Sequence, residues 1–278
     1  MKLAIDLGGT NIRIGQVENG TILQKCNISC PSQEPEGVVL EEICGLIDTM
    51  MNKRVTGIGI GVPSVVDAQK GIVYDVVNIP SWKSVPLKQY LESRFKIPVA
   101  VNNDANCFAL GEKRFGLGQD YKNMVGITLG TGVGAGIIID GKLYGGRNTG
   151  AGELAATPYR NEDYEFYCCG KFFTEKYGIT GKEAAFQASQ GEPLAQAVWR
   201  EFGTHLGKLL QLYILAYDPD AIVIGGGIAK AGPYYKEAMM ESLYHKFLFP
   251  KSLENIYIGF SELADVSLLG ASALLNEK

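Results

Sequence analysis

Short alternating runs of apolar residues open the chain, and helical spacing follows further along it. Asn19-Gly20 between two such runs is a strong hairpin signal, so we expect a meander of strands at the start. Because strands and helices then alternate, the pattern predicts an α/β layer architecture. In the first half the expected strands are residues 2–7, 12–18, 55–62 and 97–101, and the expected helices are residues 36–51, 87–95 and 104–115.

The opening pattern returns in the second half of the chain. Ile127-Thr128-Leu129-Gly130-Thr131-Gly132 aligns with Ile5-Asp6-Leu7-Gly8-Gly9-Thr10, and Asp140-Gly141 repeats the Asn19-Gly20 turn after a slip of one residue. Further on we expect helices from about residue 164 and over 193–217, and a strand at 221–224. The repeat predicts two domains, residues 1–115 with a C-terminal helix at about 266–278, and residues 116–265.

Composition narrows the classes of function. The 278 residues are 46% hydrophobic, enough for two cores, and a formal net charge of -4 offers no positive field to a polyanion. Asp6 and the glycines after it leave no apolar segment for a signal peptide, and no stretch of about 18 apolar residues follows. Six cysteines are too few for a disulfide framework. We expect a cytoplasmic protein with reduced thiols that binds neither nucleic acid nor membrane.

Gly8-Gly9-Thr10 lies at a turn between two expected strands. Residues without a Cβ let backbone N–H groups approach phosphate oxygens, and the Thr10 hydroxyl adds a donor. Asp6, on the strand that leads into the turn, is placed to hold a magnesium-bound water. For a single copy, an ordinary tight turn is the alternative.

A second glycine-rich turn favours phosphate binding. The segment from Gly130 to Gly136 has more glycine than a hairpin needs, and glycine weakens a strand, so a closely approaching ligand is the better explanation. Gly136 to Lys142 matches part of a P-loop, but Leu143 stands where Ser or Thr must meet magnesium. A strand follows the glycines, not the helix of a dinucleotide fingerprint. The two hairpins therefore predict a site for ATP phosphates in a different fold.

Asp104 closes a strand and opens a helix, so it is either a helix N-cap or a functional carboxylate. Asn102 and Asn103 precede it at the carboxyl end of a strand, where open α/β sheets place ligands. A carboxylate flanked by amides suits the orientation of a hydroxyl and the removal of its proton.

Gly225-Gly226-Gly227 after a buried strand is either a flexible turn or a flat surface for adenine or ribose.

Together these motifs resemble the ROK family of sugar kinases and repressors, within the superfamily of actin, heat-shock chaperones and hexokinase. The resemblance covers essentially the whole chain and implies an α/β fold of two ribonuclease H-like domains, as in actin-like ATPases, with an interdomain cleft. The motifs are Asp6-Leu7-Gly8-Gly9-Thr10-Asn11, Gly61-Val62-Pro63-Ser64-Val65-Val66-Asp67, Asn103-Asp104-Ala105-Asn106, Leu110-Gly111-Glu112, Leu129-Gly130-Thr131-Gly132-Val133-Gly134, Gly152-Glu153 and Asp218-Pro219 before the triple glycine.

The resemblance also implies roles for individual residues. Asp104 would be the general base for the 6-hydroxyl of a sugar, and Asn103, Glu153 and Ser64 would bind the sugar. The glycine hairpins would hold ATP, and the triple glycine its adenosine. The nucleotide-binding set implied in this way is Asp6, Gly8, Gly9, Thr10, Asn11, Gly130, Thr131, Gly132, Gly134, Gly225, Gly226 and Gly227.

ROK kinases usually carry a zinc loop, with a His three residues after the Gly-Glu glutamate and a cysteine-rich run behind it. Ala156 occupies the His position here, and Cys168-Cys169-Gly170 continues with residues that do not fit the run. Aligning residues 164–170 with the family segment just beyond the loop deletes the loop, places the vicinal cysteines on a helix and makes Glu165 a second sugar-binding carboxylate. The alternative for Glu165 is a first-turn acid favoured by the helix dipole. We predict no zinc, since the chain's two histidines lie far along it.

The sequence thus predicts an ATP- and Mg²⁺-dependent hexose kinase that phosphorylates the 6-hydroxyl, with glucose as the leading substrate. The alternatives are N-acetylmannosamine, another N-acetylhexosamine or a β-glucoside. In a different class, ROK repressors bind DNA through an added N-terminal domain, for which a first hairpin within ten residues of Met1 leaves no room. A sugar sensor without catalysis would need damage at Asp104 or the glycines, and none is visible. By analogy with the family we expect a homo-oligomer, such as a dimer.

Overall fold

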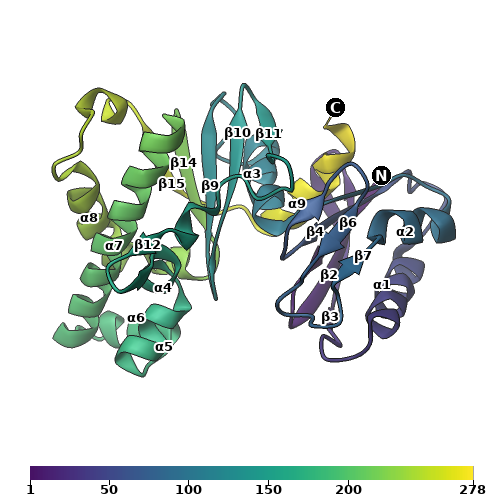
Figure 1. Cartoon of the computed structure of the whole chain (residues 1–278), viewed down its shortest axis with the longest axis horizontal. Helices are drawn as coiled ribbons and strands as arrows, with labels where there is room; N and C mark the ends of the chain where they lie inside the picture. The colour runs from purple at the N-terminus through teal and green to yellow at the C-terminus, as the bar shows by residue number, and fades with distance from the viewer. Residues whose placement is uncertain (278) are drawn as a thin grey trace. The chain divides into compact units, whose positions relative to one another are not determined.

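The structure is a computed structural model that describes residues 1–277. Its internal contacts divide the chain into two compact units (Figure 1). Unit 1 comprises residues 1–122, 136–151 and the segment from residue 263, and unit 2 comprises residues 123–135 and 152–262. The predicted domain boundary near residue 116 stays a prediction.

Unit 1 is built on a five-stranded sheet of order β3-β2-β1-β4-β8. An antiparallel meander on one side meets parallel strands on the other, and the register sets Asp6 beside Gly61 and Val62 beside Asn103. The carboxyl ends of β1, β4 and β8 therefore meet at one edge. The strands are β1 (Lys2–Leu7), β2 (Asn11–Glu18), β3 (Thr21–Ser29), β4 (Ile58–Val62) and β8 (Val99–Asn103).

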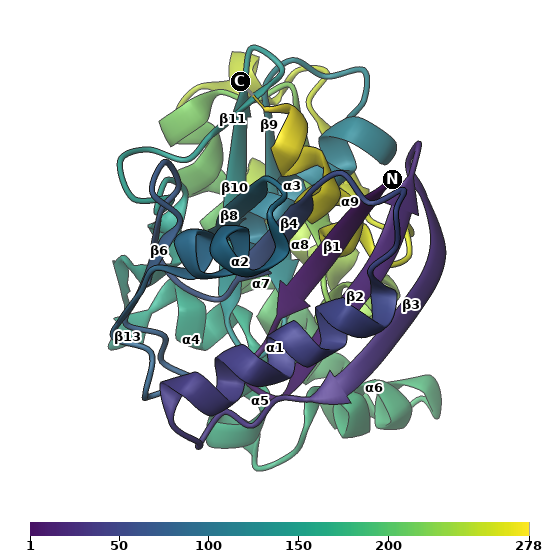
Figure 2. The same cartoon turned by 90° about the vertical axis from the view of Figure 1, so that its right-hand side faces the viewer.

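Helices cover both faces of this sheet. Leu3, Ile5 and Leu7 alternate along β1 into a core shared with α1 (Glu36–Met50) and α2 (Leu87–Phe95), which lie over one face in both views (Figures 1 and 2). Ala4 points to the opposite face and packs with α3 (Asp104–Phe115) and α9 (Val266–Ala273). A small sheet of β5 (Val66–Asp67), β6 (Ile72–Tyr74) and β7 (Ser84–Val85) follows β4 in the chain.

Two glycines allow α9 to lie close against unit 1. A Cβ at Gly59 would overlap the backbone of Ala271, and one at Gly270 would overlap the carbonyl of Cys107. The apolar C-terminal helix expected from the sequence is thus α9, extended by a 3₁₀ turn η4 (Leu274–Asn276).

Gly270→Ala is expected to destabilise the protein by about 1–3 kcal/mol, because backbone atoms must move to admit the methyl group. Gly45→Ala is the matched control, since nothing lies within 4 Å of the added Cβ in the middle of α1. That control should gain up to about 1 kcal/mol from helix propensity. Urea unfolding measures both variants, and equal stabilities would contradict the close packing of α9.

Unit 2 contributes most of a second sheet of order β11-β10-β9-β14-β15, and the boundary between the units falls within β10. The order of strands along this sheet corresponds to that of the first sheet, with β11, β10, β9, β14 and β15 in the places of β3, β2, β1, β4 and β8. Asn19-Gly20 and Asp140-Gly141 have positive φ angles of 50° and 76°, and 51° and 77°, as a type I′ turn requires. The strands are β9 (Met124–Leu129), β10 (Val133–Ile139), β11 (Lys142–Tyr144), β14 (Ala221–Gly225) and β15 (Tyr257–Phe260).

The rest of unit 2 is mainly helical. Gly203 and Gly207 on α7 leave room for the backbone of α8, so these two helices pack closely. One expectation was wrong: Cys168 ends α4, but Cys169 is extended and separates α4 from α5, so the two cysteines do not share a helix. The elements are α4 (Tyr164–Cys168), α5 (Gly170–Tyr177), α6 (Gly181–Ser189), α7 (Pro193–Tyr217), α8 (Gly232–Tyr244), strands β12 (Pro158–Tyr159) and β13 (Glu162–Asp163), and 3₁₀ turns η1 (Glu153–Ala156), η2 (Ile228–Ala231) and η3 (Pro250–Leu253).

Across residues 1–277, no helix combines the length and apolar character needed to cross a membrane.

Candidate active site

The first glycine turn joins β1 to β2 in unit 1. Its Gly8 N–H donates to the Asn11 carbonyl at 2.9 Å, and Thr10 and Asn11 are exposed. A side chain at Gly9 would collide with Asn78, so the loop between β6 and β7 of the small sheet is one reason for glycine here. Thr10 remains accessible to a ligand, as the phosphate-binding prediction requires.

Asp6 lies two residues before this turn and forms an ion pair with Arg13 on β2. Arg13 also lies 3.9 Å from Asp265, whose other oxygen binds Lys25 at 2.7 Å. A carboxylate at the end of β1 beside the glycine turn fits a hydrated Mg²⁺ ion. Arg13 would then share the Asp6 carboxylate with the ion's water shell.

The end of β8 carries the predicted sugar-binding and catalytic residues. The Asn103 side-chain oxygen accepts from the N–H groups of Ala105 (2.9 Å) and Asn106 (3.2 Å), so Asn103 is the N-cap of α3. The N-cap interpretation of Asp104 is therefore wrong, because Asp104 is the first helical residue. The Asn103 amide donates to the Ser64 carbonyl at 3.3 Å, and the Ser64 hydroxyl donates to the Tyr74 carbonyl.

Asp104 and Asp6 lie at the same end of the first sheet. Burial raises the pKa of the Cys107 thiol well above its usual value, and the charges of Asp6 and then Asp104 add to the shift. Gly61, at the end of β4, faces both Cys107 and the Cα of Asp104. Unit 1 therefore gathers Asp6, Ser64, Asn103 and Asp104 where β1, β4 and β8 end.

The second glycine turn joins β9 to β10 and is tied to the helices of unit 2. Gly130 N–H donates to the Gly132 carbonyl at 3.0 Å, and Gly170 N–H donates to the Gly130 carbonyl at 2.8 Å. A Glu165 oxygen lies 3.3 Å from the Val133 nitrogen. The start of α5 and the Glu165 carboxylate thus hold this turn in place.

Glu153 and Glu165 interact electrostatically within unit 2. Burial, and then the charge of Glu165, raise the pKa of Glu153. Glu165 also lies 3.6 Å from the Lys171 ammonium group. Gly152, with a φ angle of 101°, turns the chain into η1, and its carbonyl accepts from the Tyr213 hydroxyl at 2.8 Å.

Glu153→Gln is expected to raise the Tm at pH 7. A folded-state pKa above the unfolded value means that stability falls as the pH rises from the ordinary Glu pKa of 4.5 through the raised value, so the neutral amide removes this cost. Below pH 4.5 the gain in Tm over wild type should vanish, because Glu153 of the wild type is then protonated.

Thermal melts across this pH range measure the effect. Glu183→Gln is the opposite-sign control, because hydrogen bonds from the backbone and side chain of Thr180 lower the pKa of Glu183. A gain in Tm of Glu153→Gln that did not change with pH would contradict the raised pKa of Glu153.

A cavity of about 750 Å³ opens beside the second glycine turn within unit 2. Gly130, Thr131 and Gly227 of the predicted nucleotide residues line it, whereas Gly225 ends β14 and Gly226, at a φ of 89°, lies against the backbone of Leu129. No local signal in the sequence marks the other lining residues, which come from four separate helices and the segments next to them. They are Gly170, Thr180, Gly181, Lys182, Ala185, Trp199, Ile228, Lys230, Ala231 and Tyr234.

Comparison with known proteins decides the family, because the sequence profile of the ROK family matches residues 2–278. The chain belongs to the ROK family. This ROK chain is 30% identical to a glucokinase of Streptomyces coelicolor, over 89% of this chain and 88% of the relative. It is 32% identical to an N-acetylgalactosamine kinase of a Shewanella species, over 83% and 82% of the two chains.

The fold comparison agrees with the family. A ROK family glucokinase from Streptomyces griseus, solved in complex with glucose and AMPPNP, superposes with a TM-score of 0.84 and 29% identity over 98% of each chain. The predicted α/β fold of the actin-like ATPases is thereby confirmed.

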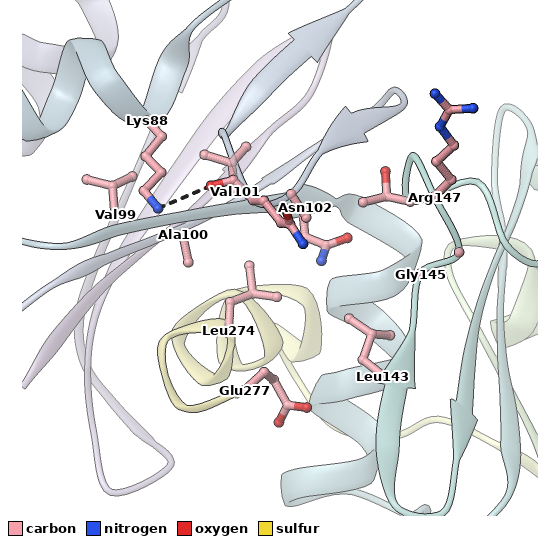
Figure 3. A pocket seen from close by; sticks show the side chains of 14 residues that line it. Lys88, Val99, Ala100, Val101, Asn102, Leu143, Gly145, Arg147, Leu274 and Glu277 are labelled. Atoms are coloured by element: carbon pink, nitrogen blue, oxygen red, sulfur yellow. Dashed lines mark hydrogen bonds between the residues drawn. The ribbon is translucent and has the colours of Figure 1, made fainter.

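A second cavity, of about 400 Å³, lies in unit 1 on the side of β8 (Figure 3). Lys88 reaches toward the strand and contacts the Gln69 carbonyl at 3.4 Å, whereas Arg147 extends away from the other side chains. Asn102 lines the cavity, and its side-chain oxygen accepts from the Asn103 N–H at 2.8 Å. Asp104 does not line it, so a ligand there would contact the strand that supports the predicted base and not the base itself.

In residues 1–277, no three His, Cys, Asp or Glu side chains are grouped as metal ligands would be. The vicinal Cys168 and Cys169 are buried, and burial raises the pKa of both thiols. The absence of zinc from this ROK protein stays a prediction.

Proposed function

We propose that this ROK protein is an ATP- and Mg²⁺-dependent kinase that phosphorylates the 6-hydroxyl of a hexose, with glucose as its leading substrate. The cavity of unit 2 beside the Gly130-Thr131 turn carries the proposal. An apolar cavity of this size next to a glycine turn suits a nucleotide, whose base is apolar and flat and whose phosphates need backbone donors.

The cavity offers a separate surface to each part of ATP. Trp199, Tyr234 and Ala185 supply apolar contacts for adenine, and Gly227 permits close approach of the ribose. Lys182 and Lys230 add positive charge. Thr131 is exposed at the tip of the glycine turn and would donate to a phosphate, as Thr10 would in the first turn.

Asp104 is the proposed general base. It stands at the end of β8 on the first turn of α3, where the Asn103 cap fixes the backbone. A carboxylate held in this way accepts the hydroxyl proton as the oxygen attacks phosphorus. Bound with ATP, Mg²⁺ would neutralise phosphate charge, and Asp6 would hold the ion through water.

The proposed sugar ligands are of two kinds. Glu153 and Glu165 offer carboxylate oxygens to sugar hydroxyls. Asn103 and Ser64 already bond to the backbone, so we propose that they shape the end of β8 and give the sugar at most a shared hydrogen bond. The 32% identity to an N-acetylgalactosamine kinase supports an N-acetylhexosamine as the second candidate substrate.

A coupled assay of ATP consumption tests the proposal against glucose, mannose, fructose, N-acetylglucosamine, N-acetylmannosamine, N-acetylgalactosamine and a β-glucoside. We expect the highest kcat/KM with glucose and a 6-phosphate product by NMR. Turnover of an N-acetylhexosamine alone would select the second candidate. No turnover with any sugar, together with sugar-dependent thermal stabilisation, would indicate a sensor and refute the kinase.

A further inference from the structure

A short hairpin joins the two proposed sugar-binding carboxylates. Glu153 begins η1, the strands β12 and β13 pair Pro158 with Asp163 and Tyr159 with Glu162, and Glu165 lies on the first turn of α4. Two-residue strands have too few hydrogen bonds to hold themselves in water. Side chains must therefore fix where this hairpin lies.

Tyr159 makes several of these contacts. Its ring stacks on Tyr164 at 4.1 Å with an interplanar angle of 13°, and it meets Tyr167 edge-on at 5.4 Å. The Arg160 guanidinium lies 5.6 Å from the Tyr159 ring and 5.9 Å from the Tyr167 ring. Tyr164 and Tyr167 both belong to α4, so Tyr159 packs against the helix that carries Glu165, and Asn161 of the hairpin also accepts from the Tyr167 hydroxyl.

The Tyr159 hydroxyl is anchored to the long helix α7. It lies 3.2 Å from Nδ1 of His205, a residue that is 1% exposed, and the other ring nitrogen lies 3.3 Å from Glu201. Burial lowers the pKa of His205, so its ring is neutral at pH 7. Burial opposes the ionisation of Glu201, but hydrogen bonds from Lys176, Tyr177 and His205 lower its pKa to about 2.

These charge states determine the direction of the hydrogen bonds. An ionised Glu201 can only accept, so Nε2 of His205 carries the single ring proton and Nδ1 is an acceptor. The Tyr159 hydroxyl therefore donates to Nδ1. A buried acceptor without this donor would be costly, so Tyr159 is held in one position.

We propose that Tyr159 is a positioning residue that sets the Glu165 carboxylate for the sugar. Tyr164 directly precedes Glu165, and the Asp163 side chain caps α4 by accepting from the Phe166 N–H at 2.7 Å. Glu165 in turn lies 3.3 Å from the Val133 nitrogen and interacts with Glu153. The role rests on the proposed function, because it concerns how tightly the sugar binds.

The test compares Tyr159→Leu, which removes the stack and the hydroxyl, with Tyr159→Phe, which removes the hydroxyl alone. Tyr177→Phe is the control, because it deletes another hydroxyl from the same Glu201 network without a ring contact to α4. We expect Tyr159→Leu to raise the sugar KM at least about tenfold and Tyr159→Phe to raise it less, with ATP KM within about twofold. Tyr177→Phe should leave both KM values unchanged, even where its Tm falls.

Equal changes of sugar KM in Tyr159→Leu and Tyr177→Phe, or a Tm loss without a KM change, would overturn the proposal. Hydrogen exchange of the α4 amides, measured without substrate, tests the positioning role of Tyr159 separately from the proposed function. Faster exchange of residues 166–168 in Tyr159→Leu than in Tyr177→Phe is expected whether or not any sugar is phosphorylated. If wild type is an active kinase but this exchange is unchanged, the positioning role is wrong and the function stands.

Discussion

Asp104→Asn is expected to lower kcat by about 10²–10⁴-fold, the usual contribution of a general base. The amide has the same shape and cannot take the hydroxyl proton. Asn103 caps α3, and the side-chain oxygen of the new amide can still accept from the Ala105 N–H as Asp104 does at 2.9 Å. The fold should therefore survive, and steady-state kinetics with the best sugar of the panel measures the loss.

Asp48→Asn is the matched control for this change. Asp48 lies on α1, is 55% exposed and pairs with Arg94 at 3.2 Å, away from the end of β8. Its kcat should equal that of wild type, and both variants should keep the wild-type affinity for AMPPNP by calorimetry. An Asp104→Asn variant within about threefold of wild type would rule out Asp104 as the base.

Ala185→Trp is expected to raise the ATP KM by about 10²-fold, equivalent to roughly 2.7 kcal/mol of nucleotide binding. Ala185 lines the unit 2 cavity on α6, and an indole there would occupy the volume that adenine needs. The sugar KM should stay within about twofold, because the proposed sugar ligands do not line this cavity.

Gln187→Trp adds the same bulk two residues further along α6, at an exposed position that does not line the cavity. Its ATP KM should match wild type. If the two variants had the same ATP KM, the cavity of unit 2 would not be the adenosine site. A rise in sugar KM that equals the rise in ATP KM would also contradict the separation of the two ligand groups.

The helix limits expected from the sequence agree with the structure where neighbouring residues supply the capping chemistry. The helix expected at residues 193–217 is α7, since Pro193 suits the first turn and Asp218-Pro219 cannot continue a helix. The strand limits of the structure differ more from those expected. The run expected at 97–101 is β8 at Val99–Asn103, because its register with Ile58–Val62 decides which residues pair.

The N-cap of α3 shows what the sequence left undecided. Either Asn103 or Asp104 has a side chain that caps well. The choice depends on backbone angles, and Asn103 is extended with φ of -65° and ψ of 148°. The Asn103 oxygen therefore accepts from the N–H groups of Ala105 and Asn106, and the Asp104 carboxylate shares the Ala105 N–H.

By itself the sequence determined the α/β class and the repeated hairpins, because turn chemistry and alternating patterns are properties of neighbouring residues. Its motif residues carried the resemblance to the ROK family, which the family profile then confirmed. Tertiary structure alone decided the cavity of unit 2, whose walls come from segments far apart in the chain. It also decided the contact of Tyr159 with His205, which are 46 residues apart. Such contacts depend on how helices pack against one another, and no periodicity within either segment encodes that packing.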